Sequence, residues 1–197
     1  MTIVDQNPTS QRAPWAKQRI LETATVLFYD EGIRMVGVDR LISASEVTKA
    51  TFYKHYGSKD NLVAAYVAAR HRRDLDYVDE MIRLSAGPAE AITALTDLIV
   101  SELQRPGFRG CLFLNAATEY PDATHPVRGH VTAHRDWYSD MIAGLLARIG
   151  HPLPGEGADE FVVARDGAMV GSSTGDSIAA SGAFRRIVAR ILADANN

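Results

Sequence analysis

The stretch Val47-Thr-Lys-Ala-Thr-Phe-Tyr-Lys-His-Tyr-Gly-Ser-Lys59 gathers unusual side chains in one short segment. It holds three lysines, one histidine and three aromatic residues and contains no acid, although the whole chain has a formal net charge of −3. A solvated helix usually mixes both signs of charge, and an enzyme core is more apolar. A basic segment with short polar side chains is typical of a surface that contacts a phosphate backbone.

The charge of the chain is unevenly distributed. Residues 1–60 carry eight Lys and Arg against seven Asp and Glu, a net of +1, whereas the remainder carries thirteen against seventeen, a net of −4. Because local patches matter more for phosphate contact than the global sum, the overall acidity does not exclude a nucleic-acid binder. The basic residues of the first part form two clusters: Arg12, Lys17 and Arg19, then Lys49, Lys54 and Lys59.

Length and composition narrow the class of protein. The 197 residues are 46% hydrophobic and 23% charged, as in an ordinary globular protein with one sizeable core. A single cysteine, Cys111, excludes an internal disulfide and fits a reducing compartment. There is no apolar signal segment and no run of eighteen apolar residues. We therefore expect a cytoplasmic protein with no membrane partner.

Hydrophobic periodicity predicts helices throughout. Residues 1–14 are polar and contain two prolines, so we expect a disordered arm there. A helix should then run to Gly32, a natural stop, followed by a short helix over 39–44. Thr48 should cap a third helix that ends before Gly57.

A long fourth helix should start after Ser58 and continue to the Gly87-Pro88 pair. Its expected apolar stripe consists of Leu62, Tyr66, Ala69, Arg73, Tyr77, Met81 and Leu84. Further helical stretches cover about 88–105, 111–120, 126–149, 157–176 and 180–195, and segments rich in proline and glycine separate them. Since no stretch alternates like a strand, the predicted fold is all-α with about nine helices.

Two short helices joined by a turn near Ser45-Glu46 make a helix-turn-helix. The segment from Gly32 through Leu62 resembles the DNA-binding domain of the TetR family of transcriptional repressors. The resemblance is carried by Gly32, by the runs from Val38 to Ile42 and from Val47 to Tyr56, and by Ser58-Lys-Asp-Asn-Leu62. It implies a three-helix DNA-binding domain at 15–60 and a larger helical domain for ligand sensing and dimerisation at 61–197.

The start of a recognition helix enters the major groove, where short polar side chains reach base edges. Thr48, Lys49 and Thr51 suit that place, and the small Ala50 allows close approach. The alternative is an ordinary solvated face. The predicted DNA-contacting residues are Thr48, Lys49, Ala50, Thr51, Tyr53, Lys54, His55 and Lys59, while Val47, Phe52 and Tyr56 should face the first helix.

Two positions depart from the family pattern. Glu46 stands where the family usually has a glycine in the turn, so a left-handed conformation there would cost about 1 kcal/mol. Gly37 stands where the family often has a threonine that caps the second helix and touches phosphate. We expect replacement of Glu46 by glycine to raise stability without weakening DNA binding.

The C-terminal part has features of an interface. Gly167, Gly171 and Gly175 repeat at a spacing of four, which places them on one helical face where another helix could approach closely. A phosphate loop is the alternative, but no Gly-Lys-Ser/Thr sequence follows. The resemblance implies a two-fold dimer built from the last two helices. The predicted interface residues are Gly167, Gly171, Gly175, Phe184, Ile187 and Ile191.

A ligand cavity among the middle helices is expected chiefly from the resemblance, and plain core packing is the alternative. Apolar helices there carry a few polar anchors, which is typical of small-molecule sites. Glu119 or Arg165 would be the orienting charge. The predicted lining residues are Phe113, Asn115, Thr118, Glu119, Trp137, Tyr138, Met141, Phe161, Arg165 and Met169.

No catalytic site, cofactor or metal is expected. His130 and His134 lie four apart with His125 nearby, a spacing that could hold a metal, but hydrogen-bonded histidines are the more ordinary case. The resulting hypothesis is a homodimeric regulator that binds a palindromic double-stranded DNA operator and is released by a small-molecule inducer. The alternatives are an all-α small-molecule-binding or enzymatic protein without DNA binding, and a helix-turn-helix protein that senses no ligand.

Overall fold

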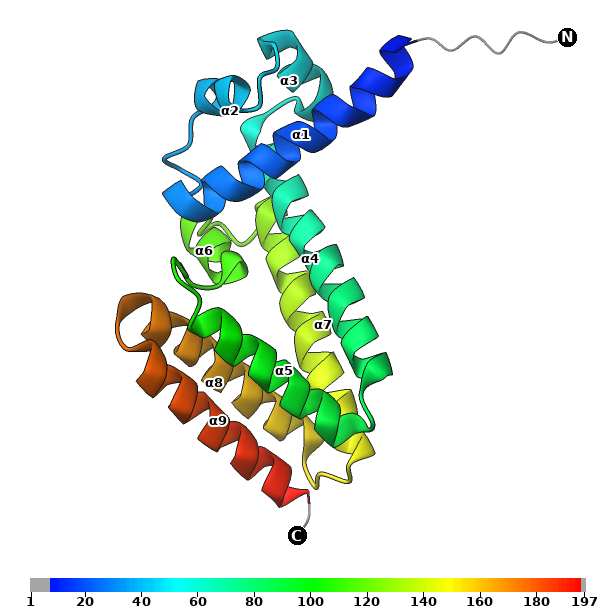
Figure 1. Ribbon diagram of the computed structural model, residues 1–197, viewed down its shortest axis with the longest axis vertical. Helices are drawn as coiled ribbons and strands as arrows, with labels where there is room; N and C mark the ends of the chain where they lie inside the picture. The colour runs from blue at the N-terminus through cyan, green and yellow to red at the C-terminus, as the bar shows by residue number, and fades with distance from the viewer. Residues whose placement is uncertain (1–7, 196–197) are drawn as a thin grey trace, which may run out of the picture.

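The computed structural model describes residues 8–195, with side chains from residue 15 onward. Within that part the chain forms nine α-helices and no strand, as predicted (Figure 1). The helices are α1 (Pro8–Glu31), α2 (Val38–Ala44), α3 (Lys49–Tyr56), α4 (Lys59–Leu84), α5 (Pro88–Leu103), α6 (Leu112–Glu119), α7 (Pro126–Arg148), α8 (Pro154–Thr174) and α9 (Ser177–Asp194).

The expected arm at 1–14 meets the structure only in part. Residues 1–7 lie outside the described residues. Helix α1 begins at Pro8, and residues 8–14 are therefore helical rather than part of an arm. Proline fits the first turn of a helix because its missing N–H would have no intrahelical partner. Pro14 removes one intrahelical hydrogen bond, but it does not end the helix.

The helix boundaries follow the predicted caps. Gly32 and Gly57, which end α1 and α3, have φ of +89° and +72°, a region that favours glycine. The Thr48 hydroxyl accepts a hydrogen bond from the Thr51 N–H at 3.1 Å, and the Ser58 hydroxyl accepts one from the Asn61 N–H at 3.1 Å. These contacts confirm Thr48 and Ser58 as N-caps, since each satisfies a donor that the first helical turn leaves free.

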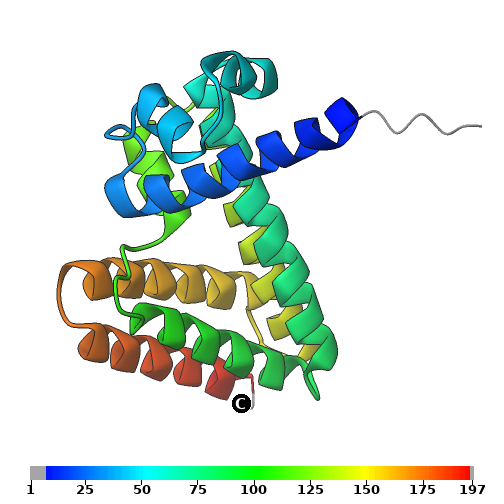
Figure 2. The same ribbon diagram turned by 45° about the horizontal axis from the view of Figure 1, so that its top comes forward.

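The helices form two connected parts. Figure 1 shows α1, α2 and α3 gathered at one end, with α4 and α7 running side by side away from them. Helices α5, α8 and α9 pack together at the other end, and Figure 2 shows them stacked below α1. Helix α6 lies between the two parts. Among residues 8–195, no helix combines the length and apolar character needed to cross a membrane.

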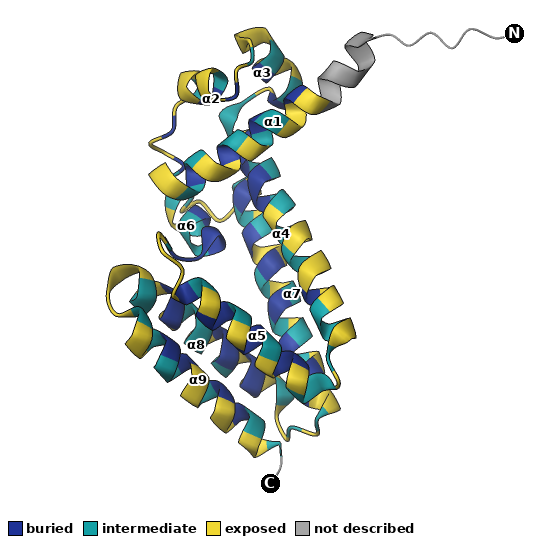
Figure 3. Cartoon of the chain, in the orientation of Figure 1, coloured by how far each residue is buried: buried dark blue, intermediate teal, exposed yellow. Residues whose placement is uncertain are grey.

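One continuous core holds both parts together (Figure 3). Leu41 and Phe52 are completely buried in the α1–α3 unit, and Phe28 of α1 contacts Tyr66 of α4 edge to face at 5.5 Å. In the other part, the rings of Phe161 in α8 and Phe184 in α9 pack edge to face, with their centroids 5.3 Å apart. Burying each such side chain contributes about 1.5–3 kcal/mol, so removing one would weaken the packing on which both parts depend.

The apolar stripe predicted for α4 is wrong in its second half. Tyr77 and Leu84 are exposed, and Val78 is the buried residue in that half. Arg70 and Asp74, which lie on the helix between Val67 and Val78, line a cavity described below. Because polar residues that line the cavity interrupt the apolar repeat, the face predicted from the periodicity is not the buried one.

Candidate nucleic-acid interface and sensor cavity

The turn between α2 and α3 is held from inside. Ser45 is completely buried, and its hydroxyl donates to the Leu41 carbonyl at 2.6 Å. Glu46 follows with φ of 51°, which is the left-handed conformation. A glycine, which the family usually has at this position, would adopt it without strain. The exposed Glu46 carboxylate forms an ion pair with Arg19 of α1. The turn is therefore strained at Glu46 and tied to α1 by a charge pair.

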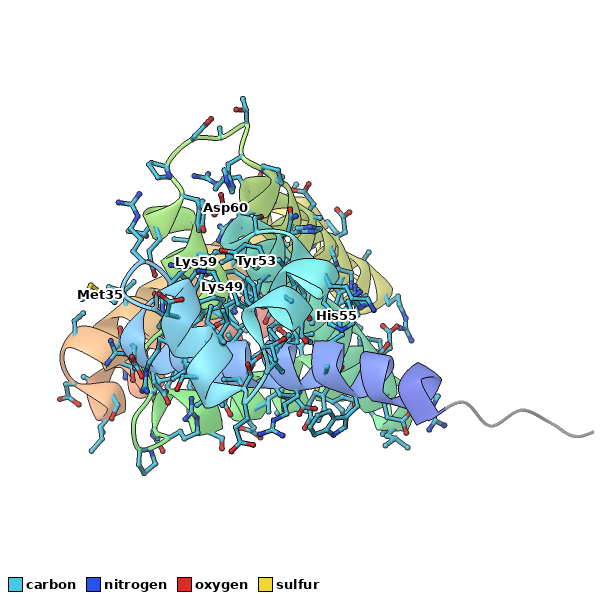
Figure 4. All side chains as sticks on the ribbon, turned by 90° about the horizontal axis from the view of Figure 1, so that it is seen from above. Met35, Lys49, Tyr53, His55, Lys59 and Asp60 are labelled. Atoms are coloured by element: carbon cyan, nitrogen blue, oxygen red, sulfur yellow. The ribbon has the colours of Figure 1, made fainter. Side chains whose placement is uncertain are left out.

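The start of α3 presents a polar surface to solvent. Thr48, Lys49, Ala50 and Lys54 are exposed, and the Thr48 and Thr51 hydroxyls lie 2.8 Å apart. Figure 4, which looks down on this end, shows Lys49, Tyr53 and Lys59 in one area, with His55 set apart toward α1. Thr51 and His55 are half-buried. The predicted residues thus lie on one end of the molecule, with His55 at its side.

The opposite side of α3 packs inward as expected. Phe52 is buried, and the buried Tyr56 donates its hydroxyl to the Lys17 carbonyl of α1 at 2.9 Å. Burial raises the pKa of Tyr56 to about 12, so the hydroxyl remains a donor at neutral pH. Tyr53 is exposed, and its ring packs edge to face on that of Phe52 with the two centroids 5.4 Å apart. The packed side fixes the direction in which the polar side points.

Arg34 and Met35, in the loop between α1 and α2, lie near this surface and were not among the residues predicted from the sequence. Met35 is 82% exposed, and Figure 4 shows it to one side of Lys59. The Lys59 ammonium donates to the Arg34 carbonyl of the same loop at 3.5 Å, and burial lowers the pKa of Lys59. The exposed loop after Gly32 is the only sequence signal that could have indicated them.

Glu119, one of the two charges expected to orient a ligand, already has partners within the chain. Its carboxylate accepts hydrogen bonds from the backbone N–H groups of Ile33 and Arg34, at 2.9 and 2.6 Å. The next residue, Tyr120, donates its hydroxyl to Asp60 in the first turn of α4 at 3.0 Å. The end of α6 therefore contacts both the loop after α1 and the first turn of α4.

A cavity of about 270 Å³ lies between α1 and the lower helices. Its walls come from α1, α4, α6 and α8 and from the end of α5 with the loop after it. Three predicted lining residues, Phe113, Arg165 and Met169, are among them. We call this space the interdomain cavity. Its α1 wall consists of Thr25, Val26, Tyr29 and Asp30.

The other predicted lining residues are divided among separate spaces. Asn115, Thr118 and Glu119 line a second cavity of about 270 Å³ beside α1, and Trp137 and Tyr138 line a third of about 90 Å³. Met141 and Phe161 line none of these three. Phe161 is fully buried in the core.

The walls of these cavities hold several charge pairs. Arg70 Nε lies 2.7 Å from Asp74 Oδ1, and burial raises the pKa of Asp74 while Arg70 opposes this. Arg165 pairs with Asp166 at 2.8 Å, and its guanidinium also reaches Cys111 Sγ at 3.6 Å. Pairing of this kind is what allows charges to remain ionised away from water.

The histidine considered as a metal ligand belongs to an aromatic cluster. His134 stacks on Phe113 with ring centroids 3.4 Å apart, and its Nδ1 lies 3.2 Å from Nδ1 of His71. Burial lowers the pKa of His134 to about 3, and Arg165 adds to the effect. Among the described residues, no group of three His, Cys, Asp or Glu side chains could hold a metal.

The sequence and the structure are both similar to those of known proteins. Residues 20–66 match the family model of bacterial regulatory proteins of the tetR family. A TetR-family transcriptional regulator from Streptomyces coelicolor is 39% identical with a TM-score of 0.88, covering 92% of this chain and 96% of that one. The chain belongs to the TetR family. The comparison with curated proteins gives no match.

More distant TetR-family structures share the fold. A transcriptional regulator from Agrobacterium tumefaciens is 20% identical with a TM-score of 0.81, covering 90% of this chain and 98% of that one. A regulatory protein from Rhodobacter sphaeroides is 20% identical with a TM-score of 0.75, covering 91% and 98%. At such low identity the likeness concerns the arrangement of helices alone.

The predicted interface residues of this TetR-family chain have different surroundings in the single chain. Phe184 and Ile191 are each only 1% exposed, because α9 turns them into the core of its own chain. Gly171 approaches Ala180 of α9, since a Cβ added there would lie 3.5 Å from the alanine Cβ. Gly175 ends α8 as its C-cap. Gly167 and Gly175 are exposed, and Gly167, Gly171, Phe184 and Ile187 all line a groove between α8 and α9.

Proposed function

We propose that this TetR-family regulator is a homodimer that binds a palindromic double-stranded DNA operator and is released by a small-molecule inducer. The observation that carries the proposal is the exposed N-terminal end of α3, where Thr48, Lys49 and Ala50 stand free above a buried Phe52. A helix fixed on one side and polar on the other can enter the major groove and read base edges.

The second copy would pack on α8 and α9. Val163, Gly167 and Val170 follow each other at helical spacing on α8, and all three are exposed. Beside them lies a groove of about 500 Å³ between the two helices, lined mainly by alanine and glycine, with Ile187 at its edge. Small residues let another helix approach closely. A two-fold pair formed there would present two α3 helices to successive turns of DNA.

Ligand release would act through α4 and α6. Helix α4 begins beside the DNA-facing surface at Lys59 and continues past the interdomain cavity at Tyr66 and Asp74. A ligand that favours one tilt of α4 would alter the separation of the two α3 helices. To change a mostly bound population into a mostly free one, its affinities for the two states must differ by several kcal/mol, about 5.5 for a full reversal.

The DNA-binding part of the proposal is tested by titrating the protein with DNA from upstream of its own coding region, across a range of salt concentrations. We expect Lys49→Ala to weaken binding and reduce sequence preference. Lys59→Ala should weaken binding to all sequences alike and flatten the salt slope by about one. Arg83→Ala, which removes an exposed charge at the far end of α4, is the matched control and should change neither quantity.

Two results would contradict these roles. The first is a wild-type protein without salt-sensitive DNA affinity, which would favour a small-molecule-binding protein that does not bind DNA. The second is an equal loss of affinity in Lys49→Ala and Lys59→Ala with unchanged salt slopes. Melting temperatures of both variants separate a lost contact from a lost fold, because Lys59 also donates a hydrogen bond to Arg34.

A further inference from the structure

The interdomain cavity has an unusual position for its size. Its wall includes Val26 and Tyr29 of α1, and Leu112 and Phe113 of α6 face it from the other part of the molecule. A molecule bound here would contact the DNA-facing unit directly as well as the helices below it. The volume of about 270 Å³ is near the lower end of small-molecule sites, roughly 300–1,000 Å³, so the occupant must be compact.

The charges inside the cavity already have partners. Arg70 pairs with Asp74 at 2.7 Å, and Arg105 pairs with Glu102 at 3.2 Å. Arg165 pairs with Asp166 at 2.8 Å. The Arg165–Asp166 pair is the most buried, with side chains 12% and 18% exposed, so a charged ligand that broke it would leave an unpaired charge at a cost, whereas the other two pairs are partly exposed. Among the charged lining residues, Asp30 alone forms no ion pair with another described residue, and its side chain is exposed.

Two tyrosine hydroxyls in the wall differ in their hydrogen bonding. The Tyr29 hydroxyl donates to the Gly110 carbonyl at 3.2 Å and accepts from the Arg109 N–H at 3.0 Å and from Arg105 at 3.2 Å. Tyr66 is only 2% exposed as a residue and lines both the interdomain cavity and the second cavity, and none of the hydrogen bonds within residues 15–195 involves its hydroxyl. The Tyr66 hydroxyl is therefore free to donate to an oxygen atom of a ligand.

The shape and chemistry of the remaining wall favour a flat ring. Tyr29, Tyr66, Phe108 and Phe113 supply aromatic faces and edges, and Met169 supplies a flexible apolar surface. The Tyr66 ring is itself held in place by Phe28, with centroids 5.5 Å apart. Aromatic rings pair well with other rings in stacked or edge-on arrangements.

We propose that the interdomain cavity binds an uncharged, flat aromatic molecule of about two fused rings, whose carbonyl-type oxygen accepts a hydrogen bond from Tyr66. The proposal rests on the ligand-responsive function above and names the class of its ligand. Anionic and cationic aromatic molecules of the same shape are disfavoured, because every arginine in the wall already has an acidic partner and the interior acids are likewise paired.

The test uses three molecules of nearly identical shape: 2-naphthamide, which is neutral, 2-naphthoate, which is anionic, and the cationic 2-naphthamidinium. Each is titrated into the full chain without DNA and followed by calorimetry. We expect 2-naphthamide to bind at least tenfold more tightly than either ion. Tyr66→Phe should weaken that binding roughly three- to tenfold, because it removes one hydrogen bond to the ligand.

Tyr138→Phe is the matched control. Tyr138 is also a buried tyrosine whose hydroxyl has no partner among the described residues, but it lines the third cavity and not the interdomain one. Tyr138→Phe should leave the affinity for 2-naphthamide unchanged. The melting temperatures of both variants show whether either is less stable than wild type. A larger effect of Tyr138→Phe than of Tyr66→Phe would place the ligand elsewhere and overturn the proposal.

The remaining outcomes are also decisive. Tighter binding of either ion, equal binding by wild type and Tyr66→Phe, or no binding of all three molecules would overturn the proposed ligand class. Failure of the proposed function looks different, because it is measured on DNA. If 2-naphthamide binds through Tyr66 but leaves the DNA complex intact, the ligand class stands and release of DNA by this ligand does not.

Discussion

The carboxylate of Glu119 accepts a hydrogen bond from the backbone N–H of Ile33 at 2.9 Å. This contact joins the end of α6 to the loop that follows α1. The same carboxylate accepts from the Arg34 N–H at 2.6 Å, and the Arg34 side chain donates back to the Glu119 carbonyl at 3.1 Å. Since α6 begins with Leu112 and Phe113 in the cavity wall, a shift of α6 would move this contact.

Loss of the Glu119 side chain should loosen the DNA-facing unit. Glu119→Ala leaves two backbone donors without their acceptor, so we expect a loss of about 1–3 kcal/mol in the free energy of unfolding. The amide protons of Ile33 and Arg34 should exchange faster with solvent. Denaturant unfolding and hydrogen exchange measure the two effects.

The control for this change is Thr118→Ala on the same turn. Thr118 is exposed, and its hydroxyl bonds only to the Leu114 carbonyl of its own helix. That variant should leave the exchange of Ile33 and Arg34 as in wild type. Unchanged exchange in Glu119→Ala would mean that α6 does not restrain the loop in solution.

A serine in place of Gly37 should stabilise α2. Gly37 is the N-cap of α2, with φ of −74° and ψ of 160°, a conformation that any residue can adopt. A Cβ added there meets nothing within 4 Å. The new hydroxyl can accept from a free N–H of the first turn, and the unfolded chain loses freedom, so Gly37→Ser should gain about 0.5–1 kcal/mol.

The hydroxyl would also stand near the DNA-facing surface, so DNA affinity should not fall. Gly57→Ser is the comparison, because Gly57 has φ of +72° and a side chain there is strained. Thermal unfolding should show a higher Tm for Gly37→Ser and a lower one for Gly57→Ser. A lower Tm in both would show that the N-terminus of α2 is not as described.

Replacement of Glu46 by glycine removes both the backbone strain at this position and the ion pair with Arg19. The left-handed Glu46 costs about 1 kcal/mol, whereas an exposed ion pair such as Arg19–Glu46 is worth about 0.2–1 kcal/mol. Glu46→Gly should therefore raise Tm slightly, and DNA affinity should not fall because an anion leaves the DNA-facing end. Glu46→Ala loses the ion pair and keeps the strain, so its Tm should lie below that of Glu46→Gly.

Local features of the fold could be predicted from sequence because they depend on neighbouring residues. The caps at Thr48 and Ser58 and the stop at Gly32 each follow from one residue and its immediate context. The inward packing of Phe52 and Tyr56 followed in the same way from their spacing on one short helix. These features sufficed to place the helix-turn-helix.

The lining of the cavity could be predicted only in part, because it depends on which helices meet. An apolar stripe on α9 looks the same whether it faces the core or a partner, and Phe184 and Ile191 face the core. Glu119 is polar on an apolar helix, which suits a ligand anchor as well as a contact with a distant loop. Nothing in the sequence indicates that Tyr29 and Tyr66 line the same cavity.

The exposed stripe of α8 should control self-association. Val163 is 71% exposed and Val170 is 54% exposed, and they flank Gly167 on one face. Val170→Glu would bury an unpaired charge twice in a two-fold dimer, so the dissociation constant should rise at least tenfold. Sedimentation equilibrium measures the change. Leu84→Glu, at an exposed apolar residue on α4, should leave the association unchanged, and a solitary wild-type molecule at micromolar concentration would contradict the proposal.

Acid should destabilise the protein through His134, which is 3% exposed. Its pKa is lowered to about 3 by burial and by Arg165, and that of an unfolded histidine is about 6.5. Between these values the unfolded chain binds a proton that the folded chain does not. The contribution to stability is therefore complete above about pH 6.5 and is lost as the pH falls toward 3, with a slope near 1.4 kcal/mol per pH unit for one proton.

His134→Gln removes the titrating ring, so the decline of unfolding free energy between pH 6.5 and 4 should become shallower, although lost stacking on Phe113 lowers stability at pH 7.5. The control is His130→Gln, one turn away and half-exposed, which leaves His134 in place and should keep the steep decline. The measurement is urea unfolding at a series of pH values. A wild-type curve that stays flat down to pH 4 would mean that water reaches His134 in solution and that the contact between α6 and α7 opens there, since burial is the cause of the lowered pKa.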